Sequence, residues 1–140
     1  FKIPARFALL APIARGKHHG KVKHWEHFND LVKPLRDKGI EPIVFPSLRE
    51  EALAKAACPD ATILPPTTLG NFAAIAKRAQ VVIANDSGVS HIAAAVGAKQ
   101  ITLVGVTDTK RTGPWNPDAI VLGENGRWPS VDEVIDNLPF

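Results

Sequence analysis

A chain of 140 residues has room for one compact domain and is too short for two full ones. Hydrophobic residues make up 45% of it and charged residues 22%, which excludes a disordered or fibrous protein. The net charge of +3 is mild, and no apolar run approaches the roughly 20 residues of a membrane-spanning helix.

The first third of the chain predicts one strand and one helix. The chain starts with no initiator methionine and no signal pattern, so we expect a segment of a longer protein. Residues 7–13 read as a buried strand, followed by the basic loop 15–23, which suggests an anionic ligand. A helix over 25–38 should then be kinked at Pro34 and end at Gly39.

The rest of the chain continues the same alternation. Ser47 and Glu50 form a potential capping box, Thr67 or Thr68 should cap a later helix, and Gly97 should end the Ala-rich one. Strands are expected at 42–45, 61–64, 81–84, 101–104 and 120–122. Helices are expected after residue 47, from 67 or 68 to 79, at 89–96 and at 131–137. This alternation predicts an α/β fold, a Rossmann-like parallel sheet of five or six strands with 81–84 near its centre and helices on both faces.

The best candidate for a phosphate site is the turn Asp86-Ser87-Gly88. Ligands of open parallel sheets bind beyond the carboxyl ends of the strands, where this turn should lie. A helix N-terminus there presents free amides, and Gly88 lets a ligand approach the backbone. His91, four residues after Ser87, falls on the same helix face. Spacing alone favours the structural alternative, a helix cap with a packed histidine.

A resemblance adds to this pattern. Residues 82–117 read VIANDSGVSHIAAAVGAKQITLVGVTDTKRTGPWNP, which contains Asp-Ser-Gly-x-x-His, an Ala-rich helix, a strand and Gly-x-Thr-Asp. This run resembles the C-terminal domain of glycosyltransferase family 9, the lipopolysaccharide heptosyltransferases, and the weaker similarity covers about residues 6 to 130. The resemblance implies the C-terminal half of a GT-B glycosyltransferase, which holds the nucleotide sugar, with residues 1–140 as one donor-binding domain. The N-terminal acceptor domain would then lie outside this chain.

The resemblance also implies roles for individual residues. Asp86, Ser87, Gly88 and His91 would surround the diphosphate and the sugar. Lys23 would be catalytic, because its ammonium would stabilise the departing diphosphate.

Four further donor contacts carried over from the family each have a structural alternative. Glu50 would bind the ribose or belong to the capping box. Thr67 would lie at the adenine edge or cap a helix. Thr107 and Asp108 would touch the sugar or form a turn.

The sequence departs from the family pattern after the first strand. Pro12-Ile13-Ala14 stands where the family has hydroxyl-bearing residues, and Lys17 or Lys21 could replace those phosphate contacts or be ordinary surface lysines. The histidines at 18, 19, 24 and 27 have no cysteine nearby and an irregular spacing, so no metal site is expected. Ser87 lacks the hydrolase elbow, and no G-x-G-x-x-G motif supports a dinucleotide cofactor.

The expected function therefore follows the family. The complete enzyme would transfer a sugar with inversion, with heptose from ADP-heptose as donor and a lipopolysaccharide core as acceptor, and it would need no metal or other cofactor. The general base would lie in the missing N-terminal domain, which would also bind the glycolipid acceptor, so this segment alone should be inactive. The alternatives are a non-catalytic nucleotide-binding module or another nucleotide-sugar enzyme such as an epimerase.

The expected surroundings of the protein rest on weaker signals. The single cysteine, Cys58, cannot form an internal disulfide and suits a reducing compartment. We therefore expect a cytoplasmic protein, and the resemblance allows peripheral association with the inner face of the inner membrane. No nucleic-acid partner is expected.

Overall fold

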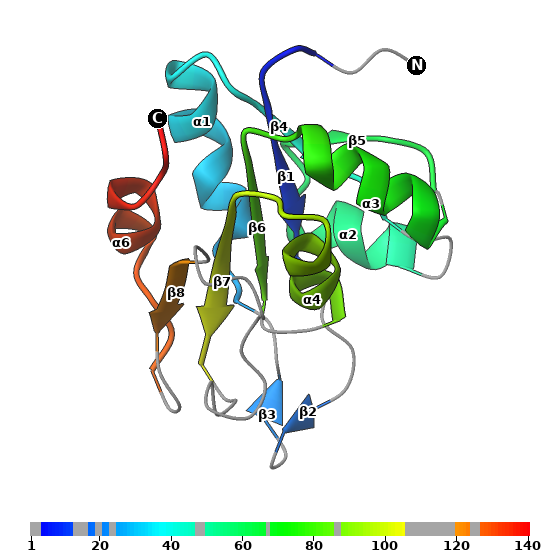
Figure 1. Cartoon of the computed structure of the whole chain (residues 1–140). Coiled ribbons are helices and arrows are strands. Elements are labelled where there is room, and N and C mark those ends of the chain that lie inside the picture. The colour runs from blue at the N-terminus through cyan, green and yellow to red at the C-terminus, as the bar shows by residue number, and fades with distance from the viewer. Residues whose placement is uncertain are drawn as a thin grey trace.

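The chain folds around one parallel β-sheet with helices on both faces, so the expected α/β class is confirmed (Figure 1). The computed structural model describes residues 4–12, 17–18, 21–22, 25–46, 50–66, 68–85, 88–105, 120–123 and 127–140. The sheet has six strands in the order β5-β4-β1-β6-β7-β8, and every neighbouring pair is parallel. The strands are β1 Phe7–Ala11, β4 Glu41–Val44, β5 Thr62–Ile63, β6 Val81–Asn85, β7 Gln100–Val104 and β8 Ile120–Gly123.

Alternating side chains of the strands build two hydrophobic cores, one on each face of the sheet. In β1, Ala8 and Leu10 belong to one core, whereas Phe7 and Leu9 belong to the other. Both faces must be covered, which explains why β1 and β6 read as continuous apolar runs. The expected central position of β6 is confirmed, because it lies between β1 and β7.

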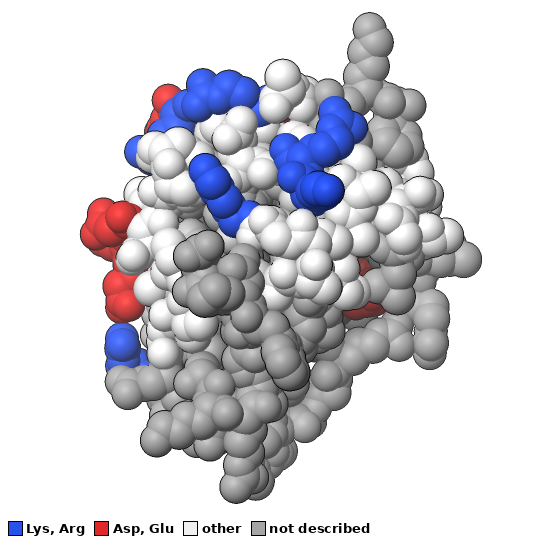
Figure 2. Space-filling view, in the orientation of Figure 1, with Lys and Arg blue, Asp and Glu red and all other residues white. Residues whose placement is uncertain are grey.

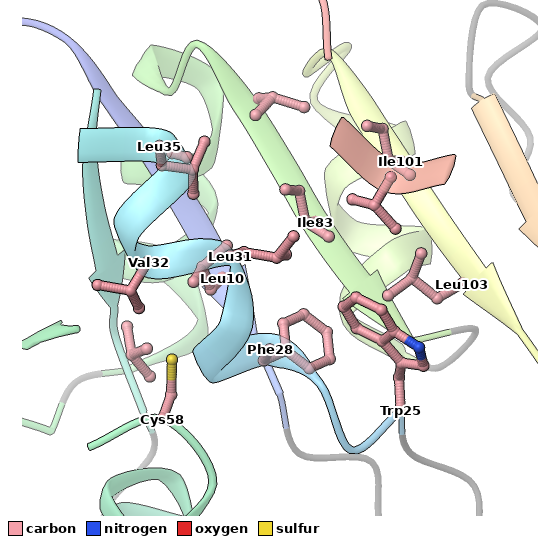
Figure 3. Packing of buried hydrophobic residues seen from close by; sticks show 14 of the residues in the cluster. Leu10, Trp25, Phe28, Leu31, Val32, Leu35, Cys58, Ile83, Ile101 and Leu103 are labelled. Atoms are coloured by element: carbon pink, nitrogen blue, oxygen red, sulfur yellow. The ribbon is translucent and has the colours of Figure 1, made fainter. Parts of the chain in front are cut away.

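The helices divide between the two cores. The first core receives side chains from a 3-10 helix, η1, from α1 and from α6, and the second from α3 and α4 (Figure 1). Figure 3 shows Phe28, Leu31 and Leu35 packed against Leu10 and Ile83 of the sheet. The bounds are η1 Phe28–Leu31, α1 Val32–Asp37, α2 Glu51–Ala57, α3 Leu69–Arg78, α4 Gly88–Ala95 and α6 Val131–Asp136.

Local sequence signals explain several helix ends. Thr68 is the N-cap of α3, and its hydroxyl accepts a hydrogen bond from the Asn71 amide at 3.3 Å. Gly39 and Gly97 follow α1 and α4 with φ of 76° and 73°, the left-handed conformation expected after a helix. Ser130 and Glu133 form a capping box at the start of α6.

Two expectations about the first half of the chain need correction. The predicted continuous helix over 25–38 is a 3-10 helix followed by α1. Pro34 falls in the first turn of α1, where its missing amide costs no helical hydrogen bond, so it marks a helix start instead of a kink. The basic loop also contains a short antiparallel pair, β2 Lys17–His18 and β3 Lys21–Val22, which the hydrophobic pattern does not predict.

The buried thiol of Cys58 offers a test of the packing beneath α2. Burial raises the pKa of Cys58 to about 11, a shift that the backbone hydrogen bond involving Ala61 only partly opposes. At about pH 8 only roughly a thousandth of the thiol would then be thiolate. We expect a disulfide reagent to label the native protein far more slowly than the urea-unfolded protein. Equal labelling rates in the two states would contradict the buried position.

Candidate functional site

The carboxyl ends of all six strands lie at one edge of the sheet, as expected from the parallel pairing. In Figure 1 the arrowheads of the long strands point to the same end of the domain, and β2 and β3 lie beyond it. β6 ends at Asn85 and α4 begins at Gly88, so only two residues separate the central strand from the helix. A helix N-terminus at this edge offers backbone amides and a positive dipole to an anion.

Asn85 is a buried polar residue whose side chain connects three segments at this edge. Its side chain is 0% exposed. The Asn85 Oδ1 accepts a hydrogen bond of 2.8 Å from the backbone amide of Trp25, and its Nδ2 donates one of 3.1 Å to the carbonyl oxygen of Pro12. The segment after β1, the segment before η1 and the end of β6 therefore meet at one amide group.

Trp25 extends this connection toward the end of the chain. Its indole Nε1 donates a hydrogen bond of 2.9 Å to the carbonyl oxygen of Pro129. The ring packs edge-on against Phe28, with centroids 5.4 Å apart, and lies between Phe28 and Leu103 in Figure 3. Trp25 has little freedom to move, because its ring is packed in the core and both its backbone amide and its indole are hydrogen-bonded.

Glycines end the last two strands of the sheet because neighbouring groups occupy the space of a side chain. A Cβ on Gly105, which follows β7, would lie 2.1 Å from ring atoms of Trp128. A Cβ on Gly123 would lie 2.0 Å from the carbonyl oxygen of Val104. The segment 127–130 therefore packs directly over the ends of β7 and β8.

Most of the predicted donor contacts lie outside the described residues. Gly88 and His91 both belong to α4, which begins at Gly88, one residue before the predicted start at 89. Predictions for six further residues fall outside the described ranges, namely Lys23, Asp86, Ser87, Thr67, Thr107 and Asp108.

The described residues bear on the structural alternatives for Thr67 and Glu50. Thr68 caps α3, which removes the helix-cap alternative for Thr67 and leaves its donor contact as a prediction. Glu50 is the N-cap residue of α2, but its side chain makes no cap hydrogen bond to that helix. The capping box with Ser47 stays a prediction, because Ser47 lies outside the described residues.

Positive charge in the described helices gathers at the other end of the domain. Lys77 and Arg78 form the last turn of α3, and Lys99 precedes β7. Figure 2 shows Lys and Arg side chains collected at this end, where the strands begin. At the carboxyl edge, α4 supplies a helix dipole, and the strands β2 and β3 of the basic segment lie beyond that edge (Figure 1).

Within the described part of the chain, no three His, Cys, Asp or Glu side chains are arranged to hold a metal ion. Of the four histidines considered for zinc, His27 has a described side chain, and its Nδ1 lies 3.0 Å from Asp30 Oδ2. The same part of the chain contains no helix with the length and hydropathy needed to span a membrane.

Sequence reasoning did not identify Asn85 and Trp25 as residues that organise the site. Both appear in the sequence as ordinary members of a turn and a helix start. A signal existed in the polar Asn85 at the end of an otherwise apolar strand, because buried amides require partners. Those partners lie as far as 73 residues away in the chain, so the pattern could not name them.

Comparison with known proteins decides the family. A model of glycosyltransferase family 9 (heptosyltransferase) matches residues 2–137. The chain belongs to glycosyltransferase family 9. This confirms the resemblance seen in residues 82–117.

Several characterised proteins are similar to this family 9 chain. Lipopolysaccharide heptosyltransferase 1 of Escherichia coli O18:K1:H7 is 31% identical over 110 residues, which cover 74% of the chain and 34% of that protein. Lipooligosaccharide heptosyltransferase 2 of Haemophilus influenzae is 28% identical over 118 residues, or 76% of the chain and 34% of that protein. The chain thus spans about a third of the length of the curated relatives it matches.

Solved structures match the fold as well. The structure of E. coli heptosyltransferase WaaC with ADP has a TM-score of 0.75 at 27% identity and covers 87% of the chain and 39% of the neighbour. The structure of WaaC with ADP-2-deoxy-2-fluoro heptose has a TM-score of 0.70 at 27% identity and covers 87% and 38%. These neighbours confirm the expected class, a Rossmann-like domain of the GT-B kind.

Proposed function

We propose that this chain is the donor-binding domain of a glycosyltransferase that moves heptose from ADP-heptose to a lipopolysaccharide core acceptor with inversion. The observation that carries the proposal is the tight connection from β6 to α4, in a domain similar to a heptosyltransferase solved with ADP. An anionic diphosphate at the N-terminus of α4 would meet free amides and the positive end of the helix dipole.

The residues at this connection suit the diphosphate chemically. Gly88, the first residue of α4, has no side chain to keep an oxygen away from the backbone. His91 lies on the same helix, one turn further along. In the proposal Asp86, Ser87 and His91 bind the donor, and the Lys23 ammonium stabilises the charge that develops as the nucleoside diphosphate leaves.

The remaining donor contacts form the rest of the proposed site. Glu50 would accept hydrogen bonds from the ribose hydroxyls, and Thr67 would lie along the adenine edge. Thr107 and Asp108 would contact the sugar, in the loop that follows Gly105.

The other half of the reaction would belong to a separate domain. An acceptor hydroxyl attacks the anomeric carbon, and a carboxylate must take its proton in the transition state. In the proposal the base and the glycolipid site belong to an N-terminal domain outside this chain. Preorganised amides and Lys23 supply the leaving-group stabilisation, so no metal is needed. The proposed location is the cytoplasm, at the inner face of the inner membrane.

Calorimetric titration with ADP, UDP and their sugars tests the donor site. Wild-type protein should prefer ADP and ADP-heptose. Lys23→Ala should weaken ADP binding roughly 10- to 100-fold, because it removes a cation that donates hydrogen bonds to the diphosphate. Asp86→Ala should weaken ADP-heptose binding by a similar factor, because its carboxylate can accept hydrogen bonds from the sugar hydroxyls. Lys77→Ala is the matched control, since Lys77 lies in the last turn of α3, which leads into the start of β6. Wild-type affinity in both site variants would refute the proposed site.

A further inference from the structure

We infer that Asn85 is a positioning residue for the donor site, whose buried side-chain amide holds the Lys23 segment in register with the Asp86–Gly88 turn. The inference rests on the proposed function, because it assigns to Asn85 the alignment of two segments that the proposal places on the donor diphosphate. It adds a residue that the family motif Asp-Ser/Thr-Gly-x-x-His does not contain.

Two hydrogen bonds carry the inference. The Trp25 amide, which donates to Asn85 Oδ1 at 2.8 Å, lies only two residues after Lys23. Asn85 itself is the residue directly before Asp86. A single side chain thus fixes the backbone on either side of the proposed diphosphate site, although the two segments lie 60 residues apart in the chain.

The second bond of the amide adds a third segment. Asn85 Nδ2 donates to the carbonyl oxygen of Pro12, the last described residue before the basic loop. The same side chain is therefore hydrogen-bonded to Pro12 and to Trp25, the two residues that flank the stretch of sequence containing Lys23. In the inference, these two bonds set the position of Lys23 relative to the turn.

Trp25 and Asn85 are each held in place by further contacts. Trp25 is 2% exposed, and its Nε1 donates to the carbonyl oxygen of Pro129. Asn85 also belongs to a strand paired on both sides, with Leu103 as its partner in β7. Neither end of the Asn85–Trp25 hydrogen bond can shift without disturbing buried structure. The bond therefore holds the two segments in a fixed relative position.

This arrangement suits a reaction that depends on alignment. Groups aimed at a developing charge must be preorganised, and a misplacement of about 1 Å at a supporting residue can cost on the order of 100-fold in rate. A side-chain amide can donate and accept at once, which an aliphatic side chain or a carboxylate cannot do. The residue type matches the geometry of one acceptor carbonyl and one donor amide.

A double-mutant cycle on ADP binding tests the inference. Affinity is measured for wild type, Asn85→Ala, Lys23→Ala and the double variant, each well below its melting temperature. Asn85→Ala should weaken ADP binding roughly 10-fold, and Lys23→Ala should then have an effect at least about threefold smaller in the Asn85→Ala background than in wild type. Coupling is expected because a lysine that is no longer held in position contributes less to ADP binding, so its removal weakens binding less.

The matched control is Thr102→Val. Thr102 is fully buried in β7, and its Oγ1 accepts a hydrogen bond of 3.1 Å from Gln100 Nε2, so the variant also removes a buried side-chain hydrogen bond. Its effect on ADP affinity should add to that of Lys23→Ala without coupling. If Asn85→Ala does not fold, Asn85→Leu takes its place in the cycle, because it fills the side-chain space without an added charge and still removes both hydrogen bonds.

The outcomes separate the inference from the proposed function. If Lys23→Ala weakens ADP binding by the same factor in both backgrounds, Asn85 has no positioning role and the inference is overturned while the donor site stands. Loss of binding in Asn85→Ala with the same coupling in Thr102→Val would also overturn it, since any buried defect would then suffice. If Lys23→Ala binds ADP and Asp86→Ala binds ADP-heptose as wild type does, the proposed donor site itself fails.

Discussion

Gly123→Ala is expected to destabilise the protein by about 3–5 kcal/mol, enough to unfold much of it. Gly123 ends β8 with φ of 87°, a conformation that an L side chain adopts only with strain. Its Cβ would also lie 2.0 Å from the carbonyl oxygen of Val104, in the neighbouring strand. That oxygen cannot move without breaking the pairing of β7 and β8. Urea unfolding followed by circular dichroism measures the loss.

Gly70→Ala is the matched control for this prediction. Gly70 lies in the first turn of α3, and an added Cβ there would meet no atom within 4 Å. The same chemical change should leave stability unaltered or raise it by roughly 0.5–1 kcal/mol. A Gly123→Ala protein with wild-type stability would show that the close approach of β8 to Val104 is wrong.

Lys23→Ala is expected to reduce kcat of the complete transferase by about 100- to 1000-fold. The proposed role of the ammonium is to stabilise charge that grows on the diphosphate as the sugar bond breaks, and loss of one such donor typically costs ~2.7–4 kcal/mol. Because the charge on the bound donor is smaller in the ground state, KM for the nucleotide sugar should change much less than kcat. Steady-state kinetics with ADP-heptose and a lipopolysaccharide core acceptor measures both constants.

Two comparisons make this prediction specific. Lys77→Ala removes a lysine from the end of α3 that leads to the start of β6 and should leave kcat unchanged. Lys23→Arg keeps the positive charge and should recover part of the rate, though its planar group fits the position differently. A large rise in KM with an unaltered kcat would indicate that Lys23 only binds the donor, against its proposed role in the transition state.

The fold was largely predictable because its signals are local. The continuous apolar runs of β1 and β6 indicated strands buried on both faces, and the sheet places both at its centre. Gly39 and Gly97 indicated helix ends because the left-handed conformation favours glycine. Pro34 misled the prediction, since the pattern does not say where in a helix a proline falls.

Some features of the candidate site were predictable from the sequence and others were not. The position of the turn before α4 followed from the order of strand, glycine and Ala-rich helix, which is local information. The antiparallel pair β2–β3 did not, because two-residue strands carry too little periodicity to be recognised. Asn85 was read as a turn residue, although the structure buries it completely.

By itself, the sequence determined the α/β class, the approximate bounds of most strands and helices, the family, and the location of the turn proposed to hold the donor. Only the tertiary structure decided what lies beneath that turn, namely the Asn85–Trp25 and Trp25–Pro129 hydrogen bonds and the glycine contacts at Gly105 and Gly123. Periodicity, caps and turns depend on neighbours a few residues apart. A hydrogen bond between residues 60 positions apart depends on the strand order, which brings distant segments to one edge of the sheet.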